Sequence, residues 1–148
     1  MTSALIDTPL LRDYLRGDRR ARKALESFNH RSMSVVSWLE LMAICPEELT
    51  DPTRGFLRTF ERLSVSEGIA DEALRLMQRK PGLPMARALS WATANVNQLT
   101  YVTCDPSHIS LKTDRGVQLA YRGEAPPATE ASNSSRGTGS TGPRAASP

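Results

Sequence analysis

Short apolar runs alternate with amphipathic stretches over the first 122 residues of the chain. The apolar run 4–6 predicts a short buried strand. Thr8 followed by Pro9 is a favourable place to begin a helix. Apolar residues recur at helical spacing from there to residue 15, and Gly17 ends the run. The same reasoning predicts further strands over 33–36, 63–65, 100–103 and 117–121. Further helices are predicted over 19–28, 38–44 and 84–96. Two more helices are predicted to begin at residue 51 and after a cap at Ser64 or Ser66.

This order of strands and helices predicts the fold class. Strand and helix alternate along the chain, which is typical of an α/β fold with a mainly parallel central sheet flanked by helices. From Gly123 onward the chain is rich in Ala, Ser, Gly, Thr and Pro and has no apolar periodicity. We therefore expect one domain over 1–122 and a disordered, low-complexity tail over 123–148 that is dispensable for folding.

Composition narrows the class of protein. Hydrophobic residues make up 39% of the 148 residues, and no apolar run approaches the roughly 18 residues of a membrane span. The N-terminus reaches Asp7 too early for a signal peptide, so a secreted or membrane protein is not expected. Cys45 and Cys104 form neither a disulfide framework nor a metal knuckle. Two reduced thiols are typical of a cytoplasmic protein.

The net charge of +3 is mild, but basic residues are concentrated near the N-terminus. Six basic and two acidic residues lie between Arg12 and Lys23. Such a stretch can contact the phosphates of a nucleic acid, and it can equally be the solvated face of a helix. The arginines that could make such phosphate contacts are Arg12, Arg16, Arg19, Arg20 and Arg22.

Three acidic residues follow predicted strands. Asp7 and Asp105 come after the first strand and the strand 100–103, and Glu40 lies about one helical turn past the second. Parallel strands bring such residues to one edge of the sheet, where ligands bind. Clustered carboxylates repel one another, and a divalent cation relieves the repulsion and can activate water against a phosphodiester. The alternative is that these acids only cap helices or face solvent. His30 and His108 are too few for a histidine-based site.

Four short segments resemble the motifs of one family. They are residues 4–8 (ALIDT) with 14–18 (YLRGD), 34–41 (SVVSWLEL), 86–94 (ARALSWATA) and 101–105 (YVTCD). In this order they are similar to the motifs of PIN-domain proteins, particularly the small VapC-type toxin ribonucleases. The resemblance implies a small three-layer fold and a metal-dependent endoribonuclease from a toxin–antitoxin pair. It also implies a homodimer, a small antitoxin whose C-terminal segment covers the site, and Mg²⁺ or Mn²⁺ held by Asp7, Glu40 and Asp105.

The chain departs from the family pattern at two positions. Pro9 stands where the family has asparagine, and Arg87 stands where its third motif supplies an aspartate. Beside Asp7 or Asp105, the Arg87 guanidinium would neutralise charge that otherwise attracts a metal; alternatively, it would contact a phosphate directly. Two other functions therefore stay open: a catalytically impaired module that binds RNA or a protein partner, and an interaction domain with no nucleic-acid role.

Overall fold

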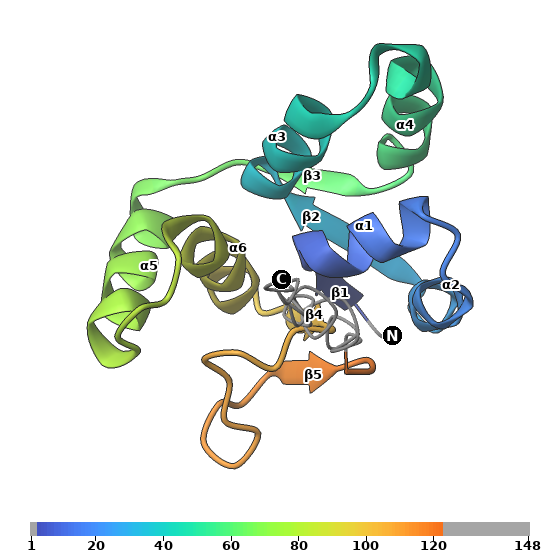
Figure 1. Cartoon of the computed structure of the whole chain (residues 1–148). Coiled ribbons are helices and arrows are strands. Elements are labelled where there is room, and N and C mark those ends of the chain that lie inside the picture. Colours follow the sequence, from blue (N-terminus) through green and yellow to red (C-terminus); the bar gives the residue numbers. More distant parts are fainter. Residues whose placement is uncertain (1–2, 123–148) are drawn as a thin grey trace, which may run out of the picture.

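The central element is a five-stranded, all-parallel sheet with strand order β3-β2-β1-β4-β5 (Figure 1). This computed structural model describes residues 3–122, so the predicted tail over 123–148 lies outside the described residues. The strands are β1 (Ser3–Ile6), β2 (His30–Ser34), β3 (Glu61–Leu63), β4 (Thr100–Thr103) and β5 (Val117–Leu119). The predicted α/β class with a parallel sheet is confirmed.

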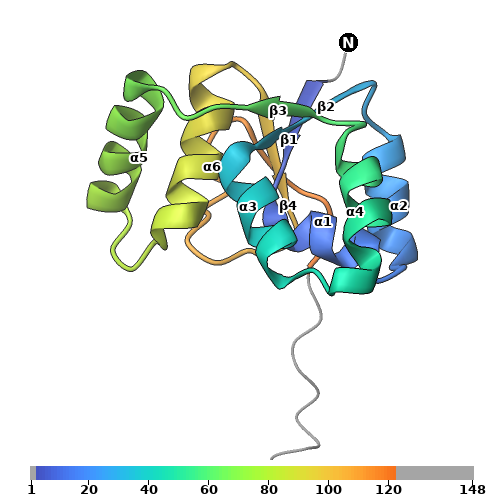
Figure 2. The same ribbon diagram turned by 90° about the horizontal axis from the view of Figure 1, so that it is seen from above.

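Helices cover both faces of the sheet, which gives three layers (Figures 1 and 2). One face packs against α1–α4 and the other against α5 and α6. Helix α3 contacts both α4 and α6, and Figure 2 shows it between them. The helices are α1 (Thr8–Leu15), α2 (Arg19–Glu26), α3 (Val35–Ile44), α4 (Thr50–Leu57), α5 (Glu67–Arg79) and α6 (Met85–Val96), with a 3₁₀ turn, η1 (Glu47–Leu49), before α4. No helix within residues 3–122 has the length and apolar character needed to cross a bilayer.

Burial on both faces of the sheet explains why apolar residues follow one another in β1 and β4. Ile6 and Val102 point into the core beneath α1–α4, whereas Leu5 and Tyr101 point into the core beneath α5 and α6. All four side chains are fully buried. A strand that is covered on both sides has no solvent face and therefore shows no alternation of apolar and polar residues.

Two predicted strand boundaries were wrong. The strand expected over 33–36 ends at Ser34, because the Ser34 hydroxyl accepts a hydrogen bond from the Val36 amide at 3.1 Å and begins α3 there. The cap thus outweighs the strand preference of β-branched Val35 and Val36. The strand expected over 63–65 lies two residues earlier, because β3 pairs in register with residues 32–34 of β2.

The helix expected over 38–44 begins three residues earlier, at Val35, and the other boundaries changed little. Ser66, and not Ser64, caps α5 by accepting a hydrogen bond from the Ile69 amide at 3.2 Å. The last strand ends at Leu119, so Tyr121 lies outside it. The strand over 100–103 has the predicted bounds. These elements bring the ends of β1 and β4 beside α3 and α6.

Candidate functional site

The three predicted acidic residues line one small pocket of about 180 Å³. Asp7 follows β1 directly, Asp105 lies two residues beyond β4, and Glu40 lies on α3. Because β1 and β4 are parallel neighbours, their carboxyl ends meet at the same edge of the sheet. Arg12 of α1 and Arg87 of α6 line the same pocket. We call it the acidic pocket.

Asp7 is the most deeply buried of the three acids, with 2% of its surface exposed. The Thr103 hydroxyl donates a hydrogen bond to Asp7 Oδ2 at 2.7 Å. Burial raises the pKa of Asp7, because it disfavours the charged form more than the Thr103 bond and the positive charge of Arg87 favour it. The Asp7 side chain makes no capping hydrogen bond to α1. Asp7 thus occupies the N-cap position of α1, while its carboxylate is bound by Thr103 of β4.

Glu40 is connected to α6 through hydroxyl groups. The Thr8 hydroxyl donates to Glu40 Oε1 at 2.9 Å and also lies 2.8 Å from the Ser37 hydroxyl. The Ser37 and Ser90 hydroxyls are 3.2 Å apart. Glu40 lies in the second turn of α3, because the helix begins at Val35, earlier than the sequence predicted. The polar chain fixes the side of α3 that faces the acidic pocket.

Arg87 lies between two of the carboxylates. Its Nε is 3.8 Å from Asp7 Oδ2, and its Nη1 is 3.5 Å from Asp105 Oδ2. The side chain is only 9% exposed. Burial opposes its charge, but the neighbouring Tyr101, Asp7 and Asp105 outweigh that effect and raise the pKa of Arg87. An arginine in this position is a permanent positive charge inside the pocket.

The guanidinium of Arg87 also holds the loop that follows β4. Nη1 donates to the Ser107 carbonyl, and Nη2 donates to the Asp105 carbonyl at 2.5 Å. Nη2 and Nε lie 3.4 Å from the Thr103 and Tyr101 hydroxyls. Every nitrogen of the guanidinium thus has an acceptor within the protein. Sequence reasoning missed Tyr101 and Thr103 as partners, because only their place in a buried strand could have indicated that role.

Asp105 is the most accessible of the acids that Arg87 contacts, with a side chain 42% exposed. The Ser107 amide donates to Asp105 Oδ1 at 2.9 Å. Partial burial opposes ionisation, but the hydrogen bonds from Ser107 and the charge of Arg87 outweigh it and lower the pKa of Asp105. The rim of the pocket therefore carries an ionised carboxylate.

These donors do not fit a divalent cation. Within residues 3–122, no three His, Cys, Asp or Glu side chains are grouped closely enough to hold a metal ion. The position beside Asp7 and Asp105 that a cation would need is taken by the Arg87 guanidinium. His30 is bound elsewhere, with its Nε2 2.8 Å from Glu61 Oε2.

The predicted basic residues fall into two groups. Arg12, Arg16 and Arg20 line a hollow of about 510 Å³ that borders the acidic pocket and shares Pro9 and Asp105 with it. The Nε atom of Arg12 is buried and finds no hydrogen-bond partner among residues 3–122. A buried donor of this kind is one that a bound acceptor would satisfy.

Arg19 and Arg22 lie farther along, in a separate hollow of about 340 Å³ beside Gly17. Arg22 forms an ion pair with Glu26 at 3.4 Å across one turn of α2. Arg20 binds Asp18 at 2.8 Å. The structure therefore places three of the five predicted arginines next to the acidic pocket and two away from it.

Comparison with known proteins gives matches among solved structures alone: no protein-family model and no curated protein matches the chain. The chain is 30% identical to one in a toxin–antitoxin complex from Klebsiella pneumoniae, with a TM-score of 0.75 over 81% of this chain and 99% of that one. A chain of FitAcB from Neisseria gonorrhoeae is 20% identical, with a TM-score of 0.59 over 71% of this chain and 89% of that one. A chain of VapBC2 from Rickettsia felis, bound to a promoter DNA fragment, is 16% identical, with a TM-score of 0.63 over 78% and 96%.

The fold is thus shared with chains of the Klebsiella pneumoniae toxin–antitoxin complex, of FitAcB and of VapBC2. With 30% identity over nearly the whole of the Klebsiella pneumoniae chain, this protein belongs to the same family as that component of a toxin–antitoxin complex. The two more distant structures support the fold alone.

Proposed function

We propose that this chain is the toxin-type, VapC-like component of a toxin–antitoxin module, with a PIN-like domain that engages RNA. Three observations support the proposal: the order of the four sequence motifs, the gathering of Asp7, Glu40 and Asp105 in one pocket, and the family relation. The expected partners are a small antitoxin protein that covers the acidic pocket and a second copy of the chain.

Within this role there are two candidate activities. The first is the metal-dependent endoribonuclease that the sequence predicts, with Mg²⁺ or Mn²⁺ at the three carboxylates. The second is an RNA-binding component that does not cleave. The position of Arg87 carries our choice of the second, because its guanidinium lies 3.8 Å from Asp7 and 3.5 Å from Asp105. An internal arginine neutralises the carboxylates without providing the open coordination position that hydrolysis requires.

The residues around the pocket have distinct parts in this proposal. Arg87 holds the loop after β4 and has no nitrogen left without an acceptor, so it is not the phosphate contact. Arg12 lines both the acidic pocket and the neighbouring hollow, so it is the arginine placed to bind phosphate at the rim, and Arg16 and Arg20 extend the basic surface away from it. This arrangement binds a nucleic acid through its backbone.

The test is Mn²⁺ binding by isothermal titration calorimetry and cleavage of a labelled RNA with Mn²⁺ or with EDTA. We expect the natural protein to show neither EDTA-sensitive cleavage nor measurable Mn²⁺ binding. Arg87→Asp should bind Mn²⁺, because it removes the internal positive charge and adds a fourth carboxylate. Arg79→Asp on α5 is the matched control, since it makes the same charge change on an exposed helix.

Two results would count against this proposal. Cleavage by the natural protein that needs Mn²⁺ and stops with EDTA would establish the endoribonuclease instead. Equal Mn²⁺ binding by the Arg87→Asp and Arg79→Asp variants would mean that Arg87 does not govern the pocket.

A further inference from the structure

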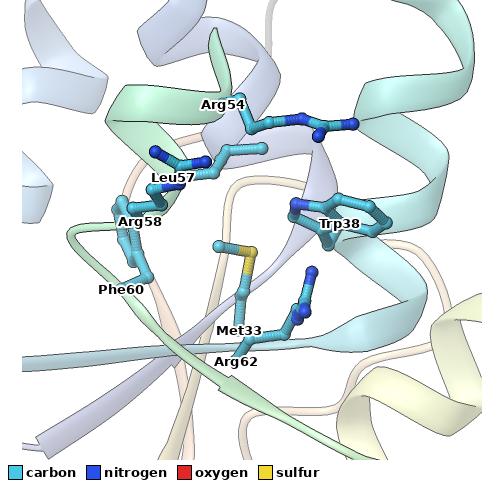
Figure 3. A pocket seen from close by; sticks show the side chains of 7 residues that line it. All are labelled: Met33, Trp38, Arg54, Leu57, Arg58, Phe60 and Arg62. Carbon is cyan, nitrogen blue, oxygen red and sulfur yellow. The ribbon is translucent and has the colours of Figure 1, made fainter. Parts of the chain in front are cut away.

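A second pocket, of about 430 Å³, lies on the other side of α3 (Figure 3). It shares no lining residue with the acidic pocket. Glu40 and Trp38 are two positions apart on α3, so at 100° per residue they point to nearly opposite sides of the helix. We call it the basic aromatic pocket; its lining residues are Met33, Trp38, Arg54, Leu57, Arg58, Phe60 and Arg62.

The three arginines of this pocket have no acidic partner within residues 3–122. Arg54, Arg58 and Arg62 are exposed, and none has a carboxylate oxygen within 4.0 Å among the residues that the structure describes. The nearest acid in sequence, Glu61, faces away, because successive residues of a strand point to opposite sides. Its carboxylate is bound by His30 at 2.8 Å. The pocket thus carries an uncompensated positive charge.

The ring of Trp38 contacts two of these arginines. The guanidinium carbon of Arg62 lies 4.5 Å from the centre of the Trp38 ring, and that of Arg54 lies 5.9 Å from it. Figure 3 shows the indole between the two side chains. Cation–π attraction holds a guanidinium near an aromatic ring and leaves its N–H groups able to bind an anion. The contact with Trp38 therefore reduces the ordering that anion binding would require.

The floor of the pocket is apolar. Met33 and Leu57 are almost fully buried, and Phe60 is 5% exposed. Arg31 stacks on the Phe60 ring at 5.1 Å and adds a fourth positive charge beside the pocket. Arginines gathered beside an aromatic ring are typical of sites for single-stranded nucleic acid, where the guanidinium groups bind the backbone phosphates.

We infer that the basic aromatic pocket binds the backbone phosphates of a single-stranded nucleic acid, through Arg54, Arg58 and Arg62. This site is separate from the acidic pocket and does not rest on the proposed function, since it needs neither cleavage nor an antitoxin. The pocket is large enough for one nucleotide unit. An acidic peptide is the competing ligand, and competition with hexaglutamate separates the two.

The test is fluorescence anisotropy with a labelled octauridylate at several salt concentrations. The double variant Arg54→Gln/Arg62→Gln removes two proposed phosphate contacts, and Arg75→Gln/Arg79→Gln removes the same charge from α5. Each phosphate contact contributes about 0.7 to the slope of log affinity against log salt for a single strand. We expect the slope to fall by about 1.4 in the first variant and to stay unchanged in the second.

A second readout is the fluorescence of Trp38, which inorganic phosphate and the oligonucleotide should both change. Trp91 is 2% exposed and stacked on Tyr101, so Trp38→Phe should abolish the response. Arg58 makes no cation–π contact with Trp38 or Phe60, so Arg58→Gln replaces the double variant if that variant does not fold. It should lower the slope of log affinity against log salt by about 0.7. The inference fails if both double variants weaken binding equally, or if hexaglutamate displaces the oligonucleotide at lower concentration than inorganic phosphate does.

Discussion

The two pockets on either side of α3 hold arginine in opposite ways. In the acidic pocket, Arg87 is buried and all its nitrogens have acceptors in the protein. In the basic aromatic pocket, Arg54 and Arg62 are exposed and lie 5.9 and 4.5 Å from the centre of the Trp38 ring, with no carboxylate within 4.0 Å among residues 3–122. The same side chain is an internal counter-ion in one place and a charge available to a ligand in the other. Burial and the supply of acceptors decide which role it takes.

The largest expected effect comes from removing the buried arginine. Arg87→Ala leaves Asp7 buried without its cation and leaves the Asp105 and Ser107 carbonyls without a donor. Breaking a buried pair from one side costs about 3–5 kcal/mol. We therefore expect a loss of this size in the free energy of unfolding measured in urea.

Arg87→Lys is the control for that prediction. Lysine keeps the positive charge but lacks the planar guanidinium that binds the Asp105 and Ser107 carbonyls at once, so Arg87→Lys should recover only part of the stability. A change below about 1 kcal/mol for Arg87→Ala, the size of an exposed interaction, would mean that Arg87 is not the counter-ion of this pocket.

The next prediction separates the two carboxylates that Arg87 contacts. Burial raises the pKa of Asp7, so the natural protein should lose stability as pH rises from the unfolded pKa of about 3.9 through the folded pKa. Asp7→Asn removes that pH-dependent loss, so the difference in unfolding free energy between the variant and the natural protein should shift in favour of the variant between pH 3 and pH 7. Urea unfolding at both pH values measures it.

Asp105→Asn is the matched variant of opposite sign. Because the folded pKa of Asp105 is lowered, its carboxylate contributes stability above the unfolded pKa, and that contribution is lost as pH falls through the folded pKa. The variant should therefore be less stable at pH 7 and equal to the natural protein in acid. The same sign for both variants would show that Arg87 does not distinguish the buried acid from the exposed one.

Local pattern predicted most of the fold. The strand over 100–103 has the predicted bounds and the helix predicted over 84–96 begins one residue later, at Met85, because turn residues and apolar spacing agree there. The boundaries at 33–36 and 63–65 were wrong, because a single serine cap and the pairing register of a neighbouring strand decided them. Register depends on contacts between segments far apart in sequence, which a local pattern does not contain.

The candidate site was predicted in part for the same reason. Asp7 and Asp105 could be found because residues after parallel strands meet at one edge. The loop carbonyls that bind Arg87, and the hydroxyls of Tyr101 and Thr103, become partners only through packing of α6 on β4. The basic aromatic pocket was missed altogether, since Trp38 and Arg62 lie 24 positions apart in sequence and meet only where α3 and β3 pack together.

The smallest expected effect on stability comes from the exposed arginine that stacks on Trp38. Arg62→Gln removes a cation–π contact at 4.5 Å, which at an exposed site contributes at most about 1 kcal/mol. Urea unfolding should therefore place this variant close to the control Arg79→Gln, although it weakens binding of the oligonucleotide. A loss as large as that of Arg87→Ala would show that Arg62 is a structural part of the fold. The contrast between the two pockets would then fail, because both arginines would serve the fold and neither pocket would keep one free for a ligand.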